Sequence, residues 1–389
     1  MATLTDGLRR PTWHPRVSQH LTKGPSLTSL TKRIGLGAVA ALGSLALLTG
    51  CGQAPSSTSG SGSATKAASK YLPCIVSDQG GFDDHSFNES GLNGVKQAAA
   101  KIGSTYKQVQ SATANDYASN ISNLVAQKCN AIVASGFNLV DAVKKSAATN
   151  AKTDFVMIDD NSIKADNVKP IVFETSEAAF LGGYAAAAYS KTGVVATFGG
   201  APIPPVTIYM DGFADGVKYF NQQKKKNVKV LGWNEATQKG VFVGNFTDQN
   251  KAKTVAANFL NSNADVIVPV GGPLYQGAGA AIKSSGKSAV LEGVDSDLYQ
   301  TDTAGYKNLM LVSILKNIQN VTYTAITQAA GGSFDNTQYV GDLKNGGVGL
   351  SSFHDFESKV PSSLTSEIDT IKQGISDGSI KVDSPASFK

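Results

Sequence analysis

The chain has 389 residues, of which 41% are hydrophobic and 17% charged, and its formal net charge is +5. The first fifty residues hold six basic side chains and one acidic side chain, so the rest of the chain carries 29 of each sign. This balance argues against nucleic-acid binding, which needs a basic face. Residues 70–389 are too many for one small core and predict two lobes.

The N-terminal segment indicates export from the cell. A basic stretch precedes the apolar run 34–48, which is shorter than the roughly 20 residues of a membrane span and typical of a signal peptide. The run leads into Leu48-Thr49-Gly50-Cys51, which resembles the lipobox of bacterial lipoproteins. We therefore expect residues 1–50 to be removed and Cys51 to carry the lipid. An ordinary signal peptide or an uncleaved anchor is the alternative. Residues 51–70 are rich in Ser and Gly and predict a flexible tether.

Behind the tether, short β-rich runs alternate with amphipathic stretches of helical periodicity. The predicted strands are 72–77, 106–110, 131–134, 155–158, 171–173, 194–198, 228–233, 266–270, 289–293 and 309–313. The predicted helices include 92–102, 117–128, 139–149, 178–190, 212–222 and 250–261, and the fourth of these is apolar nearly all round, as a buried helix would be. Strand, helix and strand at this spacing predict an α/β fold with parallel sheets and right-handed crossovers.

Polar residues follow several of these strands at the carboxyl end, where doubly wound sheets bind ligands. Asp78, Asp159 and Asp295 each follow a separate strand, and Gly271-Gly272 follows another. One such aspartate is usually a helix cap or a turn residue. Three aspartates that converge from separate strands predict a binding site.

The segment 77–94, SDQGGFDDHSFNESGLNG, is the most informative part of the chain. Phe87 and Asn88 open the next predicted helix and offer a face for a planar ring and an amide for its edge. The alternative is that Phe87 is a core residue that staples the helix entry.

This segment resembles the signature of the basic membrane protein family, the substrate-binding lipoproteins of ABC transporters. The family pattern is Asp-x-Gly-x-x-Asp-[Asp/Lys]-x-Ser-Phe-Asn followed by a Gly-rich helix, and the resemblance extends from Leu72 to about Phe356. Further family-like segments occur in order at 136–137, 141–143, 177–184, 212–216, 244–248, 271–272, 293–297 and 313–317. The common motif has Lys where this chain has His85, and we expect His85 to face solvent or the lobe rim with little effect on ligand class.

The resemblance implies a type I periplasmic-binding-protein fold, with two Rossmann-like lobes and a hinge. We expect lobe 1 to comprise residues 71–173 and 293–317, and lobe 2 to comprise residues 174–292 and 318–389. In that topology the first and third strands are neighbours. Cys74 and Cys129 lie near their amino ends, so we expect a disulfide at the edge away from the cleft, with two buried thiols as the alternative.

Members similar to the purine nucleoside receptors hold the base between two aromatic rings and the ribose hydroxyls with carboxylates and a lysine. The resemblance implies that Phe87 and Phe246 provide the two rings in this chain. It also implies that the polar contacts come from Asp78, Asn88, Asp159, Asp295 and Lys316. The glycine whose backbone approaches the ligand is then Gly271 or Gly272. A carboxylate can accept two hydrogen bonds from a vicinal diol, whereas three aspartates would repel a phosphate. A nucleoside, with a purine as the expected base, therefore fits better than a nucleotide.

The implied function is that of a monomeric, lipid-anchored solute-binding protein on the extracytoplasmic face of the cell membrane. It would close around a nucleoside and present it to the permease of an ABC transporter. We expect no catalytic residue, no metal site and no cofactor, since only His85 and His354 follow the signal and no nucleophile stands beside a base. The alternatives are another flat ligand such as a flavin, a sensory lipoprotein without a transport role, and a nucleoside hydrolase that uses paired carboxylates.

Overall fold

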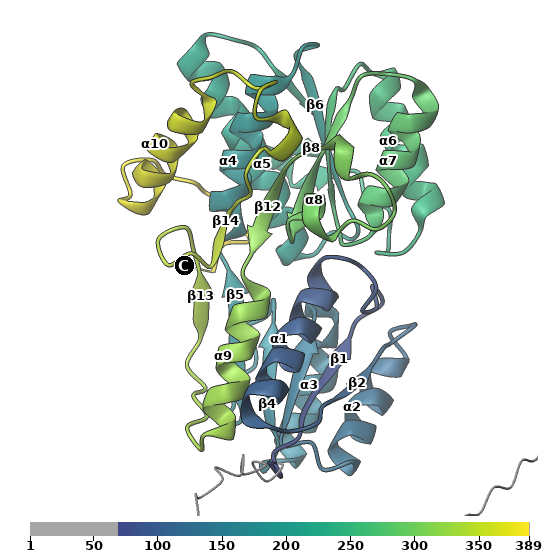
Figure 1. Ribbon diagram of the computed structural model, residues 1–389, viewed down its shortest axis with the longest axis vertical. Helices are drawn as coiled ribbons and strands as arrows, with labels where there is room; N and C mark the ends of the chain where they lie inside the picture. Colours follow the sequence, from purple (N-terminus) through teal and green to yellow (C-terminus); the bar gives the residue numbers. More distant parts are fainter. Residues whose placement is uncertain (1–68, 389) are drawn as a thin grey trace, which may run out of the picture. The chain divides into compact units, whose positions relative to one another are not determined.

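The structure is a computed structural model, and it describes residues 69–388 (Figure 1). The predicted signal peptide, the lipidation site Cys51 and the tether as far as residue 68 lie outside the described residues. Each strand and helix predicted from the sequence overlaps an observed element. The elements form two six-stranded sheets and one small two-stranded sheet, and the sheets with their helices define a first and a second lobe.

The first lobe is built on a parallel sheet with the strand order β13-β5-β4-β3-β1-β2. Its strands are β1 (Pro73–Ser77), β2 (Lys107–Val109), β3 (Ala131–Ser135), β4 (Asp154–Ile158), β5 (Val168–Phe173) and β13 (Tyr339–Gly341). Its helices are α1 (Phe87–Ile102), α2 (Asp116–Ala126), α3 (Val140–Thr149) and α9 (Ile318–Ala330). Alternate residues of β1 and β3 enter two separate hydrophobic cores, so α1 and α9 cover one face and α2 and α3 the other. Figure 1 shows α9 beside α1, although the two are far apart in the sequence.

The second lobe has the strand order β14-β12-β11-β10-β6-β7, in which only β14 is antiparallel. Its strands are β6 (Val194–Gly199), β7 (Lys229–Leu231), β10 (Val266–Val270), β11 (Val290–Asp295), β12 (Met310–Lys316) and β14 (Val348–Leu350). Its helices are α4 (Thr175–Tyr189), α5 (Pro204–Lys224), α6 (Gln249–Asn261), α7 (Leu274–Ser285), α8 (Leu298–Thr301) and α10 (Leu364–Ser376). The small sheet pairs β8 (Trp233–Asn234) with β9 (Lys239–Gly240).

Helix α4 is buried along nearly its whole length, as its apolar sequence predicts. It packs so closely against α5 that a Cβ at Gly183 would lie 2.0 Å from the backbone oxygen of Phe213. Within residues 69–388, none of the helices combines the length and the apolar character that crossing a membrane requires.

The sheet order corrects the predicted lobe boundaries. Strands β11 and β12 lie inside the second sheet, so residues 293–317 belong to the second lobe and not to the first. Helix α9 and strand β13 belong to the first lobe, although residues 318–389 were assigned as a whole to the second. The periodicity of a segment marks it as a strand, but it does not reveal which strand it will pair with.

Three crossovers consequently join the lobes, after β5, after β12 and after β13. The last described residues return to the first crossover, where Phe388 N donates a hydrogen bond of 2.8 Å to Glu174 Oε1. A short hydrogen bond from the Ser387 hydroxyl reaches the other oxygen of the same carboxylate.

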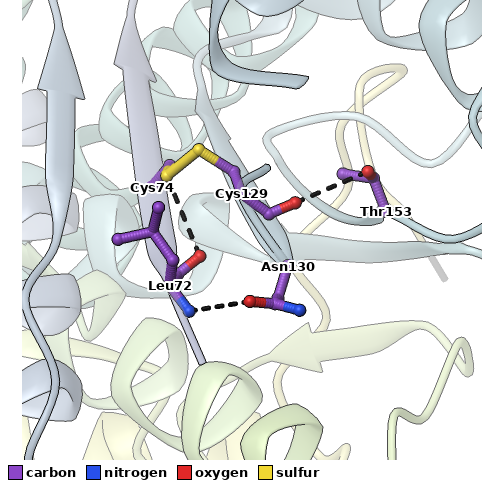
Figure 2. The surroundings of a disulfide bond; sticks show 5 residues. All are labelled: Leu72, Cys74, Cys129, Asn130 and Thr153. Atoms are coloured by element: carbon purple, nitrogen blue, oxygen red, sulfur yellow. Dashed lines mark hydrogen bonds between the residues drawn. A yellow bond between two sulfur atoms is a disulfide. The ribbon is translucent and has the colours of Figure 1, made fainter. Parts of the chain in front are cut away.

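A disulfide closes the amino end of the first sheet (Figure 2). It joins Cys74 on β1 to Cys129, just before the neighbouring strand β3, as predicted. Nearby, Leu72 N donates to Asn130 Oδ1 at 2.8 Å, and Thr153 Oγ1 donates to the backbone oxygen of Cys129. The bridge therefore lies at the opposite end of β1 from Asp78.

Candidate functional site

The carboxyl ends of strands from both sheets line one cavity between the lobes. Asp78 and Asp159 follow β1 and β4 of the first lobe, while Asp295 and Lys316 end β11 and β12 of the second. The space between the lining atoms is about 510 Å³, including the part that opens to solvent. The structure brings to this cavity all of the predicted ligand residues: Asp78, Phe87, Asn88, Asp159, Phe246, Gly271, Gly272, Asp295 and Lys316.

A buried ion pair bridges the two lobes at the cavity. Lys316 Nζ donates hydrogen bonds of 2.8 Å to both carboxylate oxygens of Asp159, and it lies 3.8 Å from Asp295 Oδ1. Only 2% of the Lys316 side chain and 7% of the Asp159 side chain are exposed. The ammonium also lies 5.0 Å from the centre of the Phe87 ring, within the range of a cation–π contact. Lys316 thus holds the end of β12 to the end of β4.

Burial changes the protonation of the cavity carboxyls. It raises the pKa of Asp159 to about 6, although Lys316 acts to lower it, and it raises the pKa of Asp84 to about 7. The pKa of Asp78 is also raised by burial, against the lowering effect of the hydrogen bond from Asn88. A ligand that donates hydrogen bonds would favour the ionised form of these groups.

Asp295 receives a hydrogen bond from each lobe. Tyr209 on α5 donates to Oδ1 at 2.8 Å, and Ser86 at the start of α1 donates to Oδ2 at 3.1 Å. Burial and the neighbouring Asp295 raise the pKa of Tyr209, so its hydroxyl keeps its proton. Tyr209 was not predicted from the sequence, because it lies inside the long helix α5 and does not directly follow a strand. No local signal marks it as a cavity residue.

Asp159 and Asp295 share an unusual backbone conformation. Their φ angles are 70° and 66°, in the left-handed region that residues other than glycine rarely adopt. Aspartate tolerates this region better than most residues, and strained backbone often marks a functional site. Corresponding strand ends in the two lobes thus turn in the same way and aim both carboxylates at the cavity.

Asp84 also lines the cavity and was missed as a site residue. Its carboxylate accepts hydrogen bonds from the backbone nitrogens of Ser86, Asn88 and Glu89 at 2.8–3.1 Å, which caps the start of α1. An aspartate just before a helical run is a capping signal and could have located it. In the family pattern, Asp84 occupies the position that is either Asp or Lys.

The orientation of the Asn88 amide is fixed by two carboxylates. Its Nδ2 donates to Asp78 Oδ1 at 2.9 Å and to Asp84 Oδ2 at 3.2 Å. Its Oδ1 is buried and has no hydrogen-bond partner within the described residues. The lining of the cavity therefore presents many acceptors, with Lys316 as the charged donor, and it suits an uncharged ligand rich in N–H and O–H groups.

Aromatic rings reach the cavity from both lobes. Phe87 begins α1, and Phe246 lies on the loop before α6. The Phe246 ring packs closely on two glycines. A Cβ at Gly200 would lie 2.3 Å from a carbon atom of the ring, and a Cβ at Gly271 would lie 2.9 Å from one. Ile203, Pro205 and Val206 at the start of α5 add an apolar wall. Flat ligand surface could therefore contact apolar groups from both lobes.

His85 was expected to face solvent or the lobe rim, and the structure places it against the other lobe rather than in open solvent. Only 14% of its side chain is exposed, and its Nε2 lies 2.8 Å from Thr303 Oγ1 of the second lobe. The backbone at His85 is in the left-handed region, with a φ of 55°.

Comparison with known proteins assigns the chain to a family and supports the fold. The sequence model of the Bmp family, described as ABC transporter substrate-binding protein PnrA-like, matches residues 73–384. The ABC transporter nucleoside-binding protein BmpA of Lactococcus lactis subsp. cremoris is 30% identical over 371 residues, which cover 91% of this chain and 100% of that protein.

Two solved structures have the same architecture. A solute-binding protein of an ABC transporter system from Aeropyrum pernix K1 has a TM-score of 0.72 at 24% identity, and the match covers 82% of this chain and 94% of that one. A transcriptional activator of the comK gene from Bacillus halodurans has a TM-score of 0.63 at 21% identity, with coverage of 81% and 99%. At these identities the likeness shows the fold alone, and it confirms the two-lobed α/β fold of the periplasmic-binding-protein type.

Proposed function

The chain belongs to the Bmp family of PnrA-like ABC transporter substrate-binding proteins, and we propose that it captures a nucleoside, with a purine base, between its two lobes. The observation that carries this proposal is the joint lining of one cavity by two aromatic rings and by an acceptor-rich set of carboxylates. The name of the Lactococcus lactis relative supports the same ligand class.

Each part of the cavity suits one part of a nucleoside. Stacking of a base on Phe87 or Phe246 contributes about 1–3 kcal/mol per ring. A vicinal diol can donate two charge-assisted hydrogen bonds to a carboxylate such as Asp78 or Asp295. The unpartnered oxygen of Asn88 can accept from an N–H on the edge of the base. A phosphate would meet several carboxyl groups around a single lysine, which favours a nucleoside over a nucleotide.

Closure of the lobes explains how such a ligand is retained. The ligand would contact groups of both lobes, so it would bind the closed form more tightly and shift the population towards it. The three crossovers are the places where a hinge rotation would be absorbed. The closed, loaded form would then be presented to the permease subunits of the transporter. The proposed role is binding, with no chemical step.

We further propose that the mature protein is a monomer held at the extracytoplasmic face of the membrane by lipid on Cys51. The support is the lipobox-like sequence that follows the apolar run 34–48. Metabolic labelling with a radioactive fatty acid tests this proposal. Wild type should incorporate the label and Cys51→Ala should not, whereas labelling of the variant would disprove anchoring at this residue.

A larger flat ligand such as a flavin is the second candidate. A neighbouring groove shares Phe246 with the cavity and could take a polar extension, and the space between its lining atoms is about 970 Å³ with open solvent included. Its lining includes Tyr117 and Lys145 of the first lobe and Asn245 of the second.

A thermal-shift screen decides between these ligands. The panel comprises guanosine, inosine, adenosine, cytidine, uridine, guanosine monophosphate and riboflavin. We expect the purine nucleosides to raise the unfolding temperature most and the monophosphate to have no effect. A shift with riboflavin and with no nucleoside would replace the proposed ligand by the second candidate.

A further inference from the structure

A set of polar contacts joins the lobes outside the cavity. Ser90 Oγ on α1 lies 2.8 Å from Ser296 Oγ, just after β11. Thr301 Oγ1 donates to the backbone oxygen of His85 at 2.8 Å, and Thr303 Oγ1 lies 2.8 Å from His85 Nε2. We call this set the interlobe seam, and its members are His85, Ser86 and Ser90 of the first lobe and Ser296, Thr301 and Thr303 of the second.

The seam is continuous with the binding site through Ser86. The Ser86 hydroxyl donates to the backbone oxygen of Val294 at 2.8 Å and to Asp295 Oδ2 at 3.1 Å. Ser86 is fully buried, whereas the contacts of Thr301 and Thr303 lie further out, where the side chains are half-buried and exposed. None of the six seam residues lines the cavity. The seam can therefore be altered at its outer end without changing the cavity lining.

The contacts of the seam depend on the closed arrangement of the lobes. Its two sides are about two hundred residues apart in the sequence and belong to different sheets. The covalent crossovers lie elsewhere, after β5, β12 and β13. A rotation absorbed at those crossovers would separate Ser90 from Ser296 and His85 from Thr303. The hydrogen bonds of the seam exist only while the lobes are together.

We propose that the interlobe seam maintains a closed population in the ligand-free protein and so sets ligand affinity without touching the ligand. This inference rests on the proposed function only for the identity of the ligand. The apparent affinity of a two-state binder scales with the fraction of molecules in the competent state. Loss of seam hydrogen bonds lowers that fraction, so binding weakens although every cavity group is retained.

His85 lies between the two sides of the seam. Its Nε2 lies 2.8 Å from Thr303 Oγ1 of the second lobe, and its Nδ1 lies 3.4 Å from Glu89 Oε2 of the first. An imidazole has only two rotatable side-chain bonds, so it loses little side-chain entropy when it contacts the Thr303 hydroxyl.

The test compares seam and control variants of the whole chain. Spin labels are introduced as non-canonical residues at Lys152 and Lys253, which are exposed on different lobes. The double variant Thr301→Val/Thr303→Val removes two hydroxyls of the seam. Thr324→Val is the matched control, because the Thr324 hydroxyl is exposed and bonds only within its own helix. Distance distributions from pulsed electron paramagnetic resonance are recorded without ligand, and guanosine affinity is measured by calorimetry.

We expect the double variant to shift the ligand-free distribution towards longer distances, and the control to match wild type. Guanosine should bind the double variant roughly tenfold more weakly, with an unchanged unfolding temperature. Identical ligand-free distributions in wild type and the double variant would overturn the proposal. If guanosine binds neither protein, the proposed ligand is wrong, whereas the ligand-free distances still decide the role of the seam.

Discussion

The two ends of the first sheet have opposite chemistry. At the amino end, Cys74 and Cys129 form a disulfide within an apolar core. At the carboxyl end, four buried aspartates and one buried lysine from the two lobes line a cavity, and they are Asp78, Asp84, Asp159, Asp295 and Lys316. Burial of charge is unfavourable unless partners compensate for it. This difference supports the proposal that the amino end stabilises the lobe and that the carboxyl end binds the ligand.

Removal of the disulfide should have the largest effect and should act on stability alone. The bridge spans 55 residues of sequence, for which the chain-entropy model gives about 4 kcal/mol. Cys74→Ala/Cys129→Ala should lower the free energy of unfolding by roughly this amount in urea titrations. Guanosine affinity at low temperature should be unchanged, since the bridge lies at the far end of β1 from the cavity. A large loss of affinity in the folded variant would break the proposed division between the two ends.

Replacement of the cavity lysine should have the next largest effect and should act on binding. Lys316→Met leaves Asp159 buried without its cation, and loss of one partner of a buried charge pair costs about 2–5 kcal/mol. We expect guanosine affinity in calorimetry to fall by at least about a hundredfold. Lys169→Met is the matched control, because Lys169 is also buried and pairs with Asp335 away from the cavity. Equal losses of affinity in both variants would mean that Lys316 acts through stability.

The residues that line the cavity could be predicted from the sequence better than the strand pairing that assigns each segment to a lobe. Phe87, Asn88 and Lys316 were predicted as ligand residues through the family resemblance, since the local pattern left Phe87 open as a core residue and did not single out Lys316. Tyr209 was missed because its contact with Asp295 is long-range and leaves no trace in its own helix. The lobe boundary was wrong because strand pairing depends on contacts between distant segments. For the same reason, the contact between His85 and Thr303 could not be foreseen.

Glu292 on β11 of the second lobe is a buried carboxyl that, unlike the cavity aspartates, has no hydrogen-bond partner within the described residues. Both of its carboxylate oxygens lack a hydrogen bond within the described residues, and burial raises its pKa well above the usual range. The unfolded chain ionises at a lower pH, so this group lowers stability as the pH rises from about 4.5 towards its folded pKa.

Glu292→Met should therefore stabilise the protein by about 1–2 kcal/mol at pH 7. The gain should be larger at pH 8 and should diminish towards pH 4.5, as measured by urea unfolding at each pH. A variant that is less stable than wild type at every pH would show that the carboxyl has a partner in solution.

The raised pKa values of the cavity predict a smaller, pH-dependent effect on binding. Asp84 and Asp159 have pKa values of about 7 and about 6, and the pKa of Asp78 is also raised. In the proposed complex the ligand hydroxyls would donate to the ionised carboxylates, so protonation below these pKa values would remove acceptors. We expect guanosine affinity in calorimetry to be constant above about pH 7.5 and to fall by roughly tenfold by pH 5.5. Affinity that rises on acidification would mean that the ligand accepts hydrogen bonds from the protonated carboxyl groups.

A nucleoside held between one aromatic ring from each lobe should bind more weakly when either ring is removed. This expectation is tested by calorimetric titration of guanosine into wild type, Phe87→Ala and Phe246→Ala. We expect one site in wild type and an affinity lower by several-fold to about a hundredfold in each variant, with the unfolding cooperativity retained. Binding of guanosine to Phe246→Ala with wild-type affinity, or no binding to wild type, would rule out this mode of binding.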